Sequence, residues 1–568
     1  MSRVVLSMAG ILPVILIATL AACGGRTAVT VENVEPIYQE ARGLKDTIKA
    51  IRARNANAAP DGTPLVDLVR RYGETRTALV RDLGRIDPSA LGEEDRRAFE
   101  VMQRAPGIDL GEEKPPPDAP AGGTETPGTA ETPGGDAAAA KPDCAYDPVA
   151  VAKEGFDPLS ERIYGCYGQA TERLSFEGKT LDRLTVFSLL PITGDRDRRR
   201  GLFLSMEPIW KAVNGDGGPG SPWRTLVRLS VARFREKNAS IESSAALLGV
   251  DPGKVEPWLV SVLEAWRDAT TGADLEPWDF GHAAGAMERA LTPHLPRESL
   301  RPLNDRVYRE LGADPVALGV EYDIEPRAGK DPVAYTDFGA RPRRLPDGGW
   351  TTGRYRVSAS YAVGGPGNLA ELLHETGHAV HIAAIRNRPA FLDWPDSDTF
   401  TEALAELVAL DLYDPEWQQR YLGRSVPAPD ALRAKYSGIV MDTAWALFEI
   451  RMHRDPSLDP NQVWTDLMRD HLHIRPHPEW SWWAVRGQLI DLPGYMLNYA
   501  LGAILVADLR ARTRELFGAQ PWGDTTWYPR VSDRLYRFGL ERPSRQVIEE
   551  YLGRPVSPDA LIRDLRGR

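Results

Sequence analysis

Two histidines and a glutamate near residue 375 have the spacing of a metal site. His374 and His378 are four residues apart in the stretch NLAELLHETGHAVH, whose apolar residues recur at helical spacing. Both imidazoles therefore project from one helical face, the geometry in which two histidines bind a single zinc ion. Glu375 would lie beside that metal, where its carboxylate can take a proton from a coordinated water. The pattern predicts one Zn²⁺ per chain with one open coordination position.

A catalytic zinc site needs a third protein ligand, and several acidic residues follow the first helix. The candidates are Asp393, Asp396 and Asp398 in a loop, and Glu402 and Glu406 in a second helix. We favour Glu402, because Glu406 lies one turn later on the same face and can hydrogen-bond the far nitrogen of a ligand imidazole. In a competing interpretation HExxH is coincidental, and Thr399 and Glu402 only form a capping box.

Composition defines the broad class of the protein. The chain has 568 residues, 42% of them hydrophobic, and a formal net charge of −11. A chain of this size can bury a large core and has room for two to four domains. Its charge is spread along the sequence, with no long basic run and no alternation of aromatic and basic residues, so we expect no nucleic acid partner.

The N-terminus has the features of an export signal. Residues 1–22 contain one early charge and a short apolar core, and Leu20-Ala21-Ala22-Cys23 resembles a bacterial lipobox. This predicts cleavage before Cys23, lipid on its sulfur, and anchorage to the cell envelope, at the periplasmic face of the outer membrane in a Gram-negative cell. An ordinary cleaved signal peptide or an uncleaved anchor is the alternative.

The remaining cysteines agree with export. Cys144 and Cys166 are left once Cys23 is lipidated. An even remainder in an oxidising compartment can form one disulfide, although two free thiols are the alternative.

Composition also divides the chain into segments. Residues 23–105 follow an amphipathic helical pattern, and residues 106–143 contain almost no large apolar side chain and should be a flexible insert. Helical periods resume over 144–568, which we interpret as one domain. The insert either separates a small helical stalk from this domain or interrupts a single helical domain.

Further features could serve a reaction at the metal. Residues 332–361 are the strongest strand prediction, and an edge strand beside the metal helix could bind an extended peptide; a purely structural hairpin is the alternative. Tyr495 and Tyr499 are four residues apart and share a helical face, from which a hydroxyl could stabilise an oxyanion; aromatic packing is the alternative. We expect His381 to support the ligands or to pack behind them, because a third-histidine site would need it further along the chain.

These motifs together resemble the mostly helical zinc peptidases that include thimet oligopeptidase, oligoendopeptidases and angiotensin-converting enzyme. The resemblance is carried by HETGHAVH, TEALAELVAL, EPWDF (276–280), AYTDF (334–338) and PGYMLNY. It is strongest over 275–509 and fainter back to about residue 187. It implies a mainly helical, two-lobed ellipsoid with a deep central cleft and a small antiparallel sheet beside the zinc helix.

The resemblance also implies roles for individual residues. His374, His378 and Glu402 would be ligands, Glu375 the base, Glu406 a partner of a ligand histidine, and Ala334 part of the substrate-binding edge. Relatives usually carry a substrate-binding histidine shortly before the tyrosines, whereas residues 487–494 contain none and Gln488 lies nearest its place. In the angiotensin-converting-enzyme branch a cation at about the position of Arg486 grips the C-terminal carboxylate of the peptide.

The sequence therefore predicts a monomeric, lipid-anchored zinc metallopeptidase that acts on short peptides. With Arg486 as an anchor it would remove C-terminal dipeptides; without that anchor it would cleave internal bonds. The alternative is a non-catalytic, zinc-stabilised envelope lipoprotein that binds peptides or envelope ligands. Glu375 argues against this alternative, since a purely structural zinc site needs no base.

Overall fold

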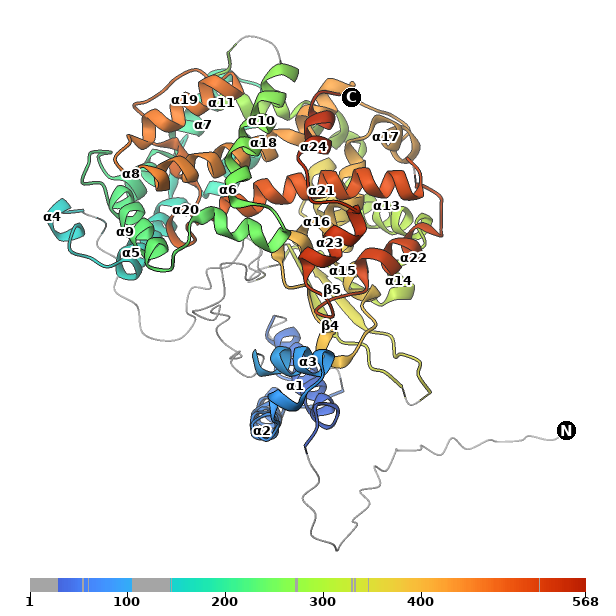
Figure 1. Cartoon of the computed structure of the whole chain (residues 1–568). Coiled ribbons are helices and arrows are strands. Elements are labelled where there is room, and N and C mark those ends of the chain that lie inside the picture. The colour runs from blue at the N-terminus through green and yellow to red at the C-terminus, as the bar shows by residue number, and fades with distance from the viewer. Residues whose placement is uncertain are drawn as a thin grey trace, which may run out of the picture.

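The computed structural model describes residues 29–567 except 54–55, 60, 105–143, 145, 271–273, 328–329, 331–333, 346 and 520. The export signal, Cys23 and the low-complexity insert lie outside the described residues. The described chain is mainly helical, with two small sheets, which confirms the predicted fold class (Figure 1). None of the helices in these ranges is both long enough and apolar enough to cross a membrane.

The helices fall into three groups along the chain. The N-terminal group is α1 (Val31–Ala53), α2 (Leu65–Leu83) and α3 (Glu93–Arg104). The second group is α4 (Pro148–Val151), α5 (Phe156–Thr171), α6 (Arg183–Leu189), α7 (Arg196–Leu204), α8 (Glu207–Asn214), α9 (Pro222–Glu236), α10 (Pro252–Ala269), α11 (Pro277–Ala284), α12 (Ala286–Leu291), α13 (Arg297–Glu310) and α14 (Pro315–Leu318). The third is α15 (Pro366–Ala384), α16 (Asp398–Ala409), α17 (Pro415–Leu422), α18 (Ala428–Arg454), α19 (Pro460–Leu472), α20 (Gln488–Asp491), α21 (Met496–Phe517), α22 (Trp527–Val531), α23 (Ser544–Leu552) and α24 (Asp559–Leu565).

The predicted strand region forms a three-stranded sheet beside α15. Strands β3 (Val320–Asp323), β4 (Tyr335–Ala340) and β5 (Arg354–Ser358) are arranged in the order β3-β5-β4. β4 pairs antiparallel with β5, but β3 pairs parallel with it, so the sheet is mixed and the expectation of an antiparallel sheet was wrong in this respect. β4 is an edge strand, and α15 packs against the sheet.

Two strands were not predicted. β1 (Leu174–Phe176) and β2 (Lys179–Leu181) form a small antiparallel hairpin. Glu177 and Gly178 connect them with positive φ angles of 49° and 72°. That backbone suits the two-residue turn that matches the twist of paired strands, so the Glu-Gly step was the available signal.

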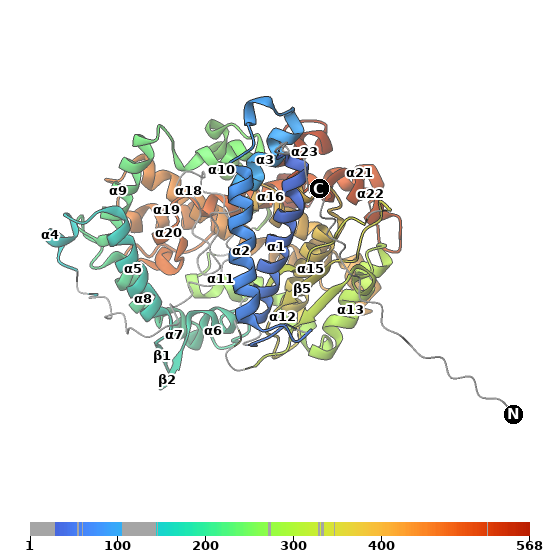
Figure 2. The same ribbon diagram turned by 90° about the horizontal axis from the view of Figure 1, so that it is seen from below.

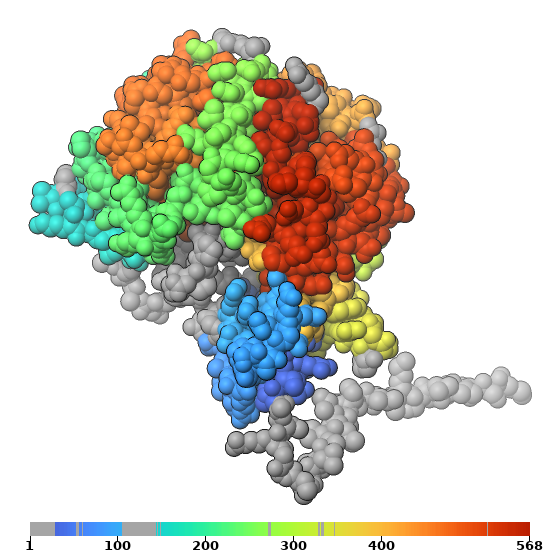
Figure 3. Space-filling model, in the orientation of Figure 1, coloured from blue at the N-terminus to red at the C-terminus, as the bar shows by residue number. Residues whose placement is uncertain are grey.

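One large hydrophobic core runs from Val151 to Leu565 and holds the second and third helix groups together. The space-filling view shows α5, α9, α10 and α19 on one side of the body and α21 to α24 on the other (Figure 3). A disulfide joins Cys144 to Cys166 of α5. The buried aromatic side chains of the body include Trp223, Trp417, Trp464 and Trp483.

The N-terminal helices pack against the body close to the sheet. Viewed from below, α1 and α2 lie side by side in front of the body (Figure 2), and α1 contacts β4 and the short turn Pro389–Phe391 that follows α15. Their apolar residues share a buried cluster with Ala390 and Phe391, which follow α15. The N-terminal segment is therefore docked on the loop that connects α15 to α16.

Candidate metal centre

A glycine allows the two helices of the predicted site to approach each other closely. Gly377 of α15 faces α16, and a Cβ atom built on it would lie 2.4 Å from the carbonyl oxygen of Ala405 and 2.9 Å from the Ala405 Cα. Both atoms belong to the backbone and cannot swing aside. Any larger residue at position 377 would therefore push α16 away from the histidines.

The sequence builds both helices in place. α15 has Pro366 in its first turn, where a missing N–H costs nothing, and it buries Leu369, Leu372 and Leu373 against the body. α16 begins after Ser397, whose hydroxyl accepts a hydrogen bond from the Phe400 N–H. Ser397 is thus the N-cap, and the Thr399–Glu402 capping box does not form. Glu402 is free of that alternative role.

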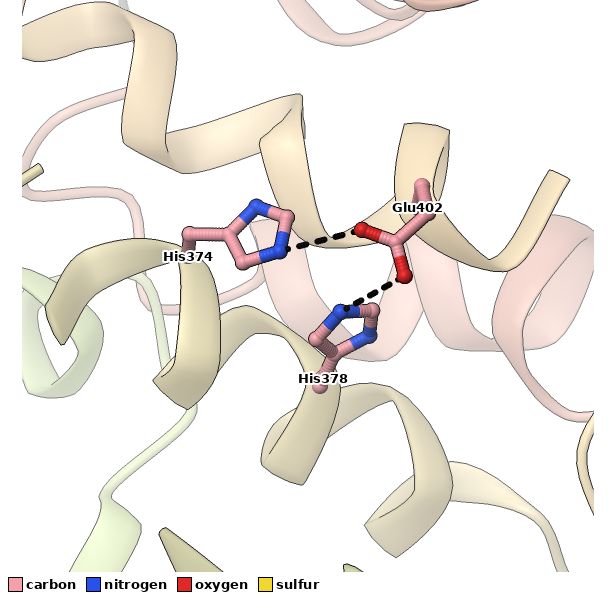
Figure 4. A group of neighbouring side chains, drawn as sticks. All are labelled: His374, His378 and Glu402. Carbon is pink, nitrogen blue, oxygen red and sulfur yellow. Dashed lines mark ion pairs between the residues drawn. The ribbon is translucent and has the colours of Figure 1, made fainter. Parts of the chain in front are cut away.

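The three predicted ligands converge (Figure 4). One Glu402 carboxylate oxygen lies 3.2 Å from His374 Nε2, and the other lies 3.5 Å from His378 Nε2. The imidazole rings stand nearly perpendicular, at 87°, with centroids 4.7 Å apart. One ligand atom from each of the three side chains lies within 4.8 Å of the others. Within the described chain, these residues form the group of His, Cys, Asp and Glu side chains that could hold a metal ion.

Two carboxylates act on His374. Glu402 faces its Nε2, and Glu406 Oε1 lies 3.0 Å from its Nδ1. Burial lowers the pKa of His374, but Glu406 and Glu402 raise it well above its ordinary value. Burial likewise raises the pKa of Glu402, and the two histidines bring it well below its ordinary value.

The predicted base is held by a residue that the sequence analysis missed. Glu375 is buried, with 3% of its surface exposed, and its Oε2 lies 2.7 Å from the Thr336 hydroxyl. Thr336 also lies 2.9 Å from the Glu375 backbone oxygen. This threonine belongs to β4, so the edge strand fixes the orientation of the Glu375 carboxylate. Its role depends on tertiary pairing and has no local sequence signal.

The other candidate side chains are distributed around this centre. His381 is fully buried between Trp394 and Tyr536, with ring centroids 6.0 and 5.3 Å away, and its nitrogens have no hydrogen-bond partner among the described residues. It therefore packs behind the site. Trp394 also contacts a ligand, because its ring centroid lies 5.6 Å from that of His378.

The two tyrosines contact each other, and the surroundings of Tyr499 include Glu402 and Arg486. Tyr499 lies on α21, its hydroxyl is 3.5 Å from Gln488 Nε2, and its ring is 5.5 Å from that of Tyr495. Burial raises the pKa of Tyr499 to about 12, with Arg486 lowering it and the Glu402 carboxylate raising it. Tyr499 is therefore protonated at neutral pH and close enough to Glu402 to sense its charge.

Arg486 already has a carboxylate partner within the chain. Its guanidinium pairs with Asp442 and lies over the Trp445 ring, 4.6 Å from the centroid. It also lies 5.9 Å from the Tyr499 ring. Ala334 is buried and lies one residue before β4, so the strand begins later than AYTDF suggested.

The three aspartates that were the alternatives to Glu402 as the third metal ligand lie outside the ligand cluster. Asp393 pairs with Arg42 and Arg341, and Asp396 accepts hydrogen bonds from the Ser544 N–H and hydroxyl. Asp398 begins α16, one turn before Glu402. None of the three joins the ligand cluster.

Comparison with known proteins gives a fold and no family. No family model matches the chain, and no curated protein matches it. A solved 3.1 Å X-ray structure assigned as an oligoendopeptidase F has the same fold, with a TM-score of 0.52 and 15% sequence identity. The match covers 95% of this chain and 96% of that one.

The donor set fits zinc. Two imidazole nitrogens and one carboxylate are the ligands of many catalytic zinc sites, which leave a fourth position open. Glu406 supplies the carboxylate that commonly orients a ligand histidine. Side-chain exposure is 47% for Glu402, 18% for His374 and 7% for His378, so the cluster is open to solvent on the Glu402 side.

Proposed function

We propose that the protein is a zinc-dependent peptidase that hydrolyses short peptides. The main support for this proposal is that His374, His378 and Glu402 converge beside Glu375, a buried carboxylate that the edge strand β4 holds in place. The fold shared with an oligoendopeptidase F structure supports the same class. Export, the lipid anchor on Cys23 and envelope location belong to the proposal on sequence grounds alone.

The reaction would divide its tasks among these residues. His374, His378 and Glu402 would hold Zn²⁺, which supplies Lewis acidity and lowers the pKa of a coordinated water to about 7. Glu375 would accept the proton at Oε1, because Thr336 occupies Oε2, and would then pass it to the leaving amine. Tyr499 would donate its hydroxyl hydrogen to the developing oxyanion.

The substrate would lie along β4. That strand pairs with β5 on one side, and no strand of the described chain pairs with its other edge. An extended peptide could add there by main-chain hydrogen bonds, with side chains alternating between the two faces. Thr336 would then link the strand that binds the substrate to the base that acts on it.

The test combines metal analysis with peptide cleavage by the purified protein. We expect about one zinc per chain and hydrolysis of short peptides. Glu375→Gln should keep the metal and abolish turnover, whereas Glu402→Gln should lose the metal or bind it much more weakly. A Glu375→Gln variant that cleaves peptides at near wild-type rate would overturn the proposed mechanism. Bound zinc with no cleavage of any peptide would favour a non-catalytic, peptide-binding protein.

A further inference from the structure

A small polar pocket lies one helical turn from the metal centre. It is lined by the start of α16, the first half of α21 and the turn-rich segment Ile241–Leu248. Its lining residues are Ser244, Leu247, Leu248, Ser397, Asp398, Thr399, Asn498 and Leu501. A cavity volume of about 10 Å³ gives it room for roughly one water-sized group.

One carboxylate oxygen in this pocket has no partner. Asp398 Oδ2 is buried and receives no hydrogen bond within the described chain. Burial raises the pKa of Asp398 to about 7, and the Glu402 carboxylate adds to this effect. A buried carboxylate without a partner carries an uncompensated cost, which a cationic hydrogen-bond donor would remove.

The rest of the lining suits an ammonium group. An ammonium has three donors and no acceptor, and it is close to a water molecule in size. The pocket is lined by Asp398, by Ser244 and Thr399, and by Asn498, whose amide oxygen accepts a hydrogen bond from the Thr399 hydroxyl at 3.4 Å. Leu247, Leu248 and Leu501 supply apolar wall that could cover the methylene groups attached to the nitrogen.

The position of the pocket matches the reach of a bound peptide. Asp398 precedes Glu402 by one turn on α16, a rise of about 6 Å. An extended residue spans about 3.5 Å, so a nitrogen about two residues from the scissile bond could reach it. The side chain of a lysine close to that bond has a similar reach.

We propose that this pocket binds a substrate ammonium group and that Asp398 sets a preference for peptides that carry one there. The group is either the α-amino terminus of a short peptide or the side chain of a lysine. This inference rests on the proposed function, because it takes the ligand to be the substrate of the neighbouring metal centre.

The test measures binding to the full chain carrying Glu375→Gln, which should retain metal without turnover. Calorimetry compares four peptides that share one sequence. The first carries both a free N-terminal amino group and a lysine, the second and third carry only one of these two ammonium groups, and the fourth carries neither. N-acetylation removes the first ammonium, and norleucine in place of lysine removes the second. We expect a peptide with the correct ammonium to bind about 10- to 100-fold more tightly than the peptide with neither. The peptide that binds more tightly shows whether the pocket binds the N-terminal amino group or the lysine side chain.

Variants then assign the preference to the pocket. Asp398→Asn should reduce the ratio between the two affinities to near one. Asp396→Asn is the matched control, because it removes a charge two residues away that faces Ser544, and the ratio should persist. Ser244→Val should also reduce the ratio by filling the pocket while leaving the Asp398 carboxyl group in place. This second variant keeps the test valid if Asp398→Asn folds poorly.

The outcomes separate this inference from the proposed function. Equal affinity for the four peptides, or a preference that survives both Asp398→Asn and Ser244→Val, overturns the ammonium pocket. In that case cleavage of the same peptides by the wild-type protein would leave the proposed function intact. Conversely, an Asp398-dependent preference in binding supports the pocket even if the wild-type protein cleaves none of the peptides.

Discussion

Thr336 is the residue on which the orientation of the base depends. Its hydroxyl lies 2.7 Å from Glu375 Oε2, and both residues are held in regular elements, β4 and α15. Thr336→Val keeps the shape of the side chain and removes the hydrogen bond. We expect kcat to fall about 10-fold, the value of one hydrogen bond to a charged group, with zinc content unchanged. Steady-state kinetics and metal analysis check this.

The hydroxyl itself can be tested against the packing of the side chain. Thr336→Ser restores a hydroxyl at the same position and should recover most of the lost rate. If Thr336→Ser and Thr336→Val are equally slow, the methyl group matters and the hydrogen bond does not.

Substitution of Tyr499 and of Tyr495 should have different effects on the reaction. Tyr499 has a pKa that responds to Glu402 and Arg486, and it is protonated at neutral pH. If it donates to the oxyanion, Tyr499→Phe should lower kcat about 100- to 1,000-fold without loss of zinc. Tyr495→Phe should have a much smaller effect and serves as the matched control. The opposite order of effects would assign the role to Tyr495, and two variants with the wild-type rate would exclude both tyrosines as the oxyanion donor.

Arg486 decides between two modes of cleavage. A C-terminal carboxylate would have to compete with Asp442, which already pairs with this guanidinium. We therefore expect the wild-type protein to cleave amidated and free-carboxylate peptides at similar kcat/KM, as an endopeptidase would. Product analysis by mass spectrometry should show cuts at internal bonds. A strong preference for the free carboxylate, lost in Arg486→Ala through a raised KM, would restore the dipeptide-releasing mode.

At the scale of elements, the contact between α15 and α16 is the critical feature. Gly377→Ala would place a methyl group 2.4 Å from the Ala405 carbonyl oxygen. The two helices must then separate, which moves Glu402 away from His374 and His378. We expect a loss of about 1 to 3 kcal/mol in the free energy of unfolding and a large loss of zinc affinity. Chemical denaturation and metal titration measure the two effects.

A second helical glycine provides the control for that change. Gly438 lies within α18 and has no atom within 4 Å of an added Cβ. Gly438→Ala should raise the free energy of unfolding by about 0.5 to 1 kcal/mol, because alanine loses less chain entropy in a helix. Zinc affinity should stay the same. If Gly377→Ala also stabilised the protein and kept its zinc, the close approach would not be required.

The same elements show what the sequence could and could not predict. His374 and His378 lie one turn apart on α15, and Glu402 and Glu406 lie one turn apart on α16, so local spacing was enough to place each pair on one helical face. The meeting of the two pairs is a tertiary contact, which the sequence suggested through its resemblance to zinc peptidases. Thr336 and Glu375 are 39 residues apart, and their contact exists only because β4 lies against α15. The parallel pairing of β3 with β5 could not be predicted from local sequence either. β3 has only four residues, too few for an alternation of apolar and polar side chains to be recognised. The export signal stays a prediction.

At the scale of the whole molecule, ion pairs tie the N-terminal helices to the loop between α15 and α16. Arg341, just after β4, pairs with Asp46 of α1 and with Asp393 of the loop, and Arg42 of α1 also pairs with Asp393. All four side chains are at most 15% exposed. The first helices of the chain thus stabilise the connection between the two helices that carry the ligands.

Asp393→Asn tests that link. It preserves the shape of the side chain but removes the negative charge that pairs with both Arg42 and Arg341. Removing one partner from a buried ion pair costs about 3 kcal/mol or more. Denaturation should show this loss, and hydrogen exchange should show faster opening of α1. Asp67→Asn is the control, because Asp67 and its partner Arg70 are 52% and 63% exposed. It should change stability by less than about 0.5 kcal/mol.

The ion pairs of Asp393 with Arg42 and Arg341 should also change how the free energy of unfolding depends on pH. Burial raises the pKa of Asp393, but Arg341 and Arg42 bring it below its ordinary value of 3.8. At a pH above 3.8 Asp393 is ionised in both the folded and the unfolded chain, and its ion pairs contribute their full stabilisation. As the pH falls below 3.8, Asp393 becomes protonated first in the unfolded chain. The contribution therefore decreases, and it is lost once the pH passes through the lowered pKa of the folded state. The wild-type free energy of unfolding should therefore decrease more steeply than that of Asp393→Asn below about pH 4. Parallel curves for the two proteins in acid would mean that the charge of Asp393 does not hold α1 to the loop.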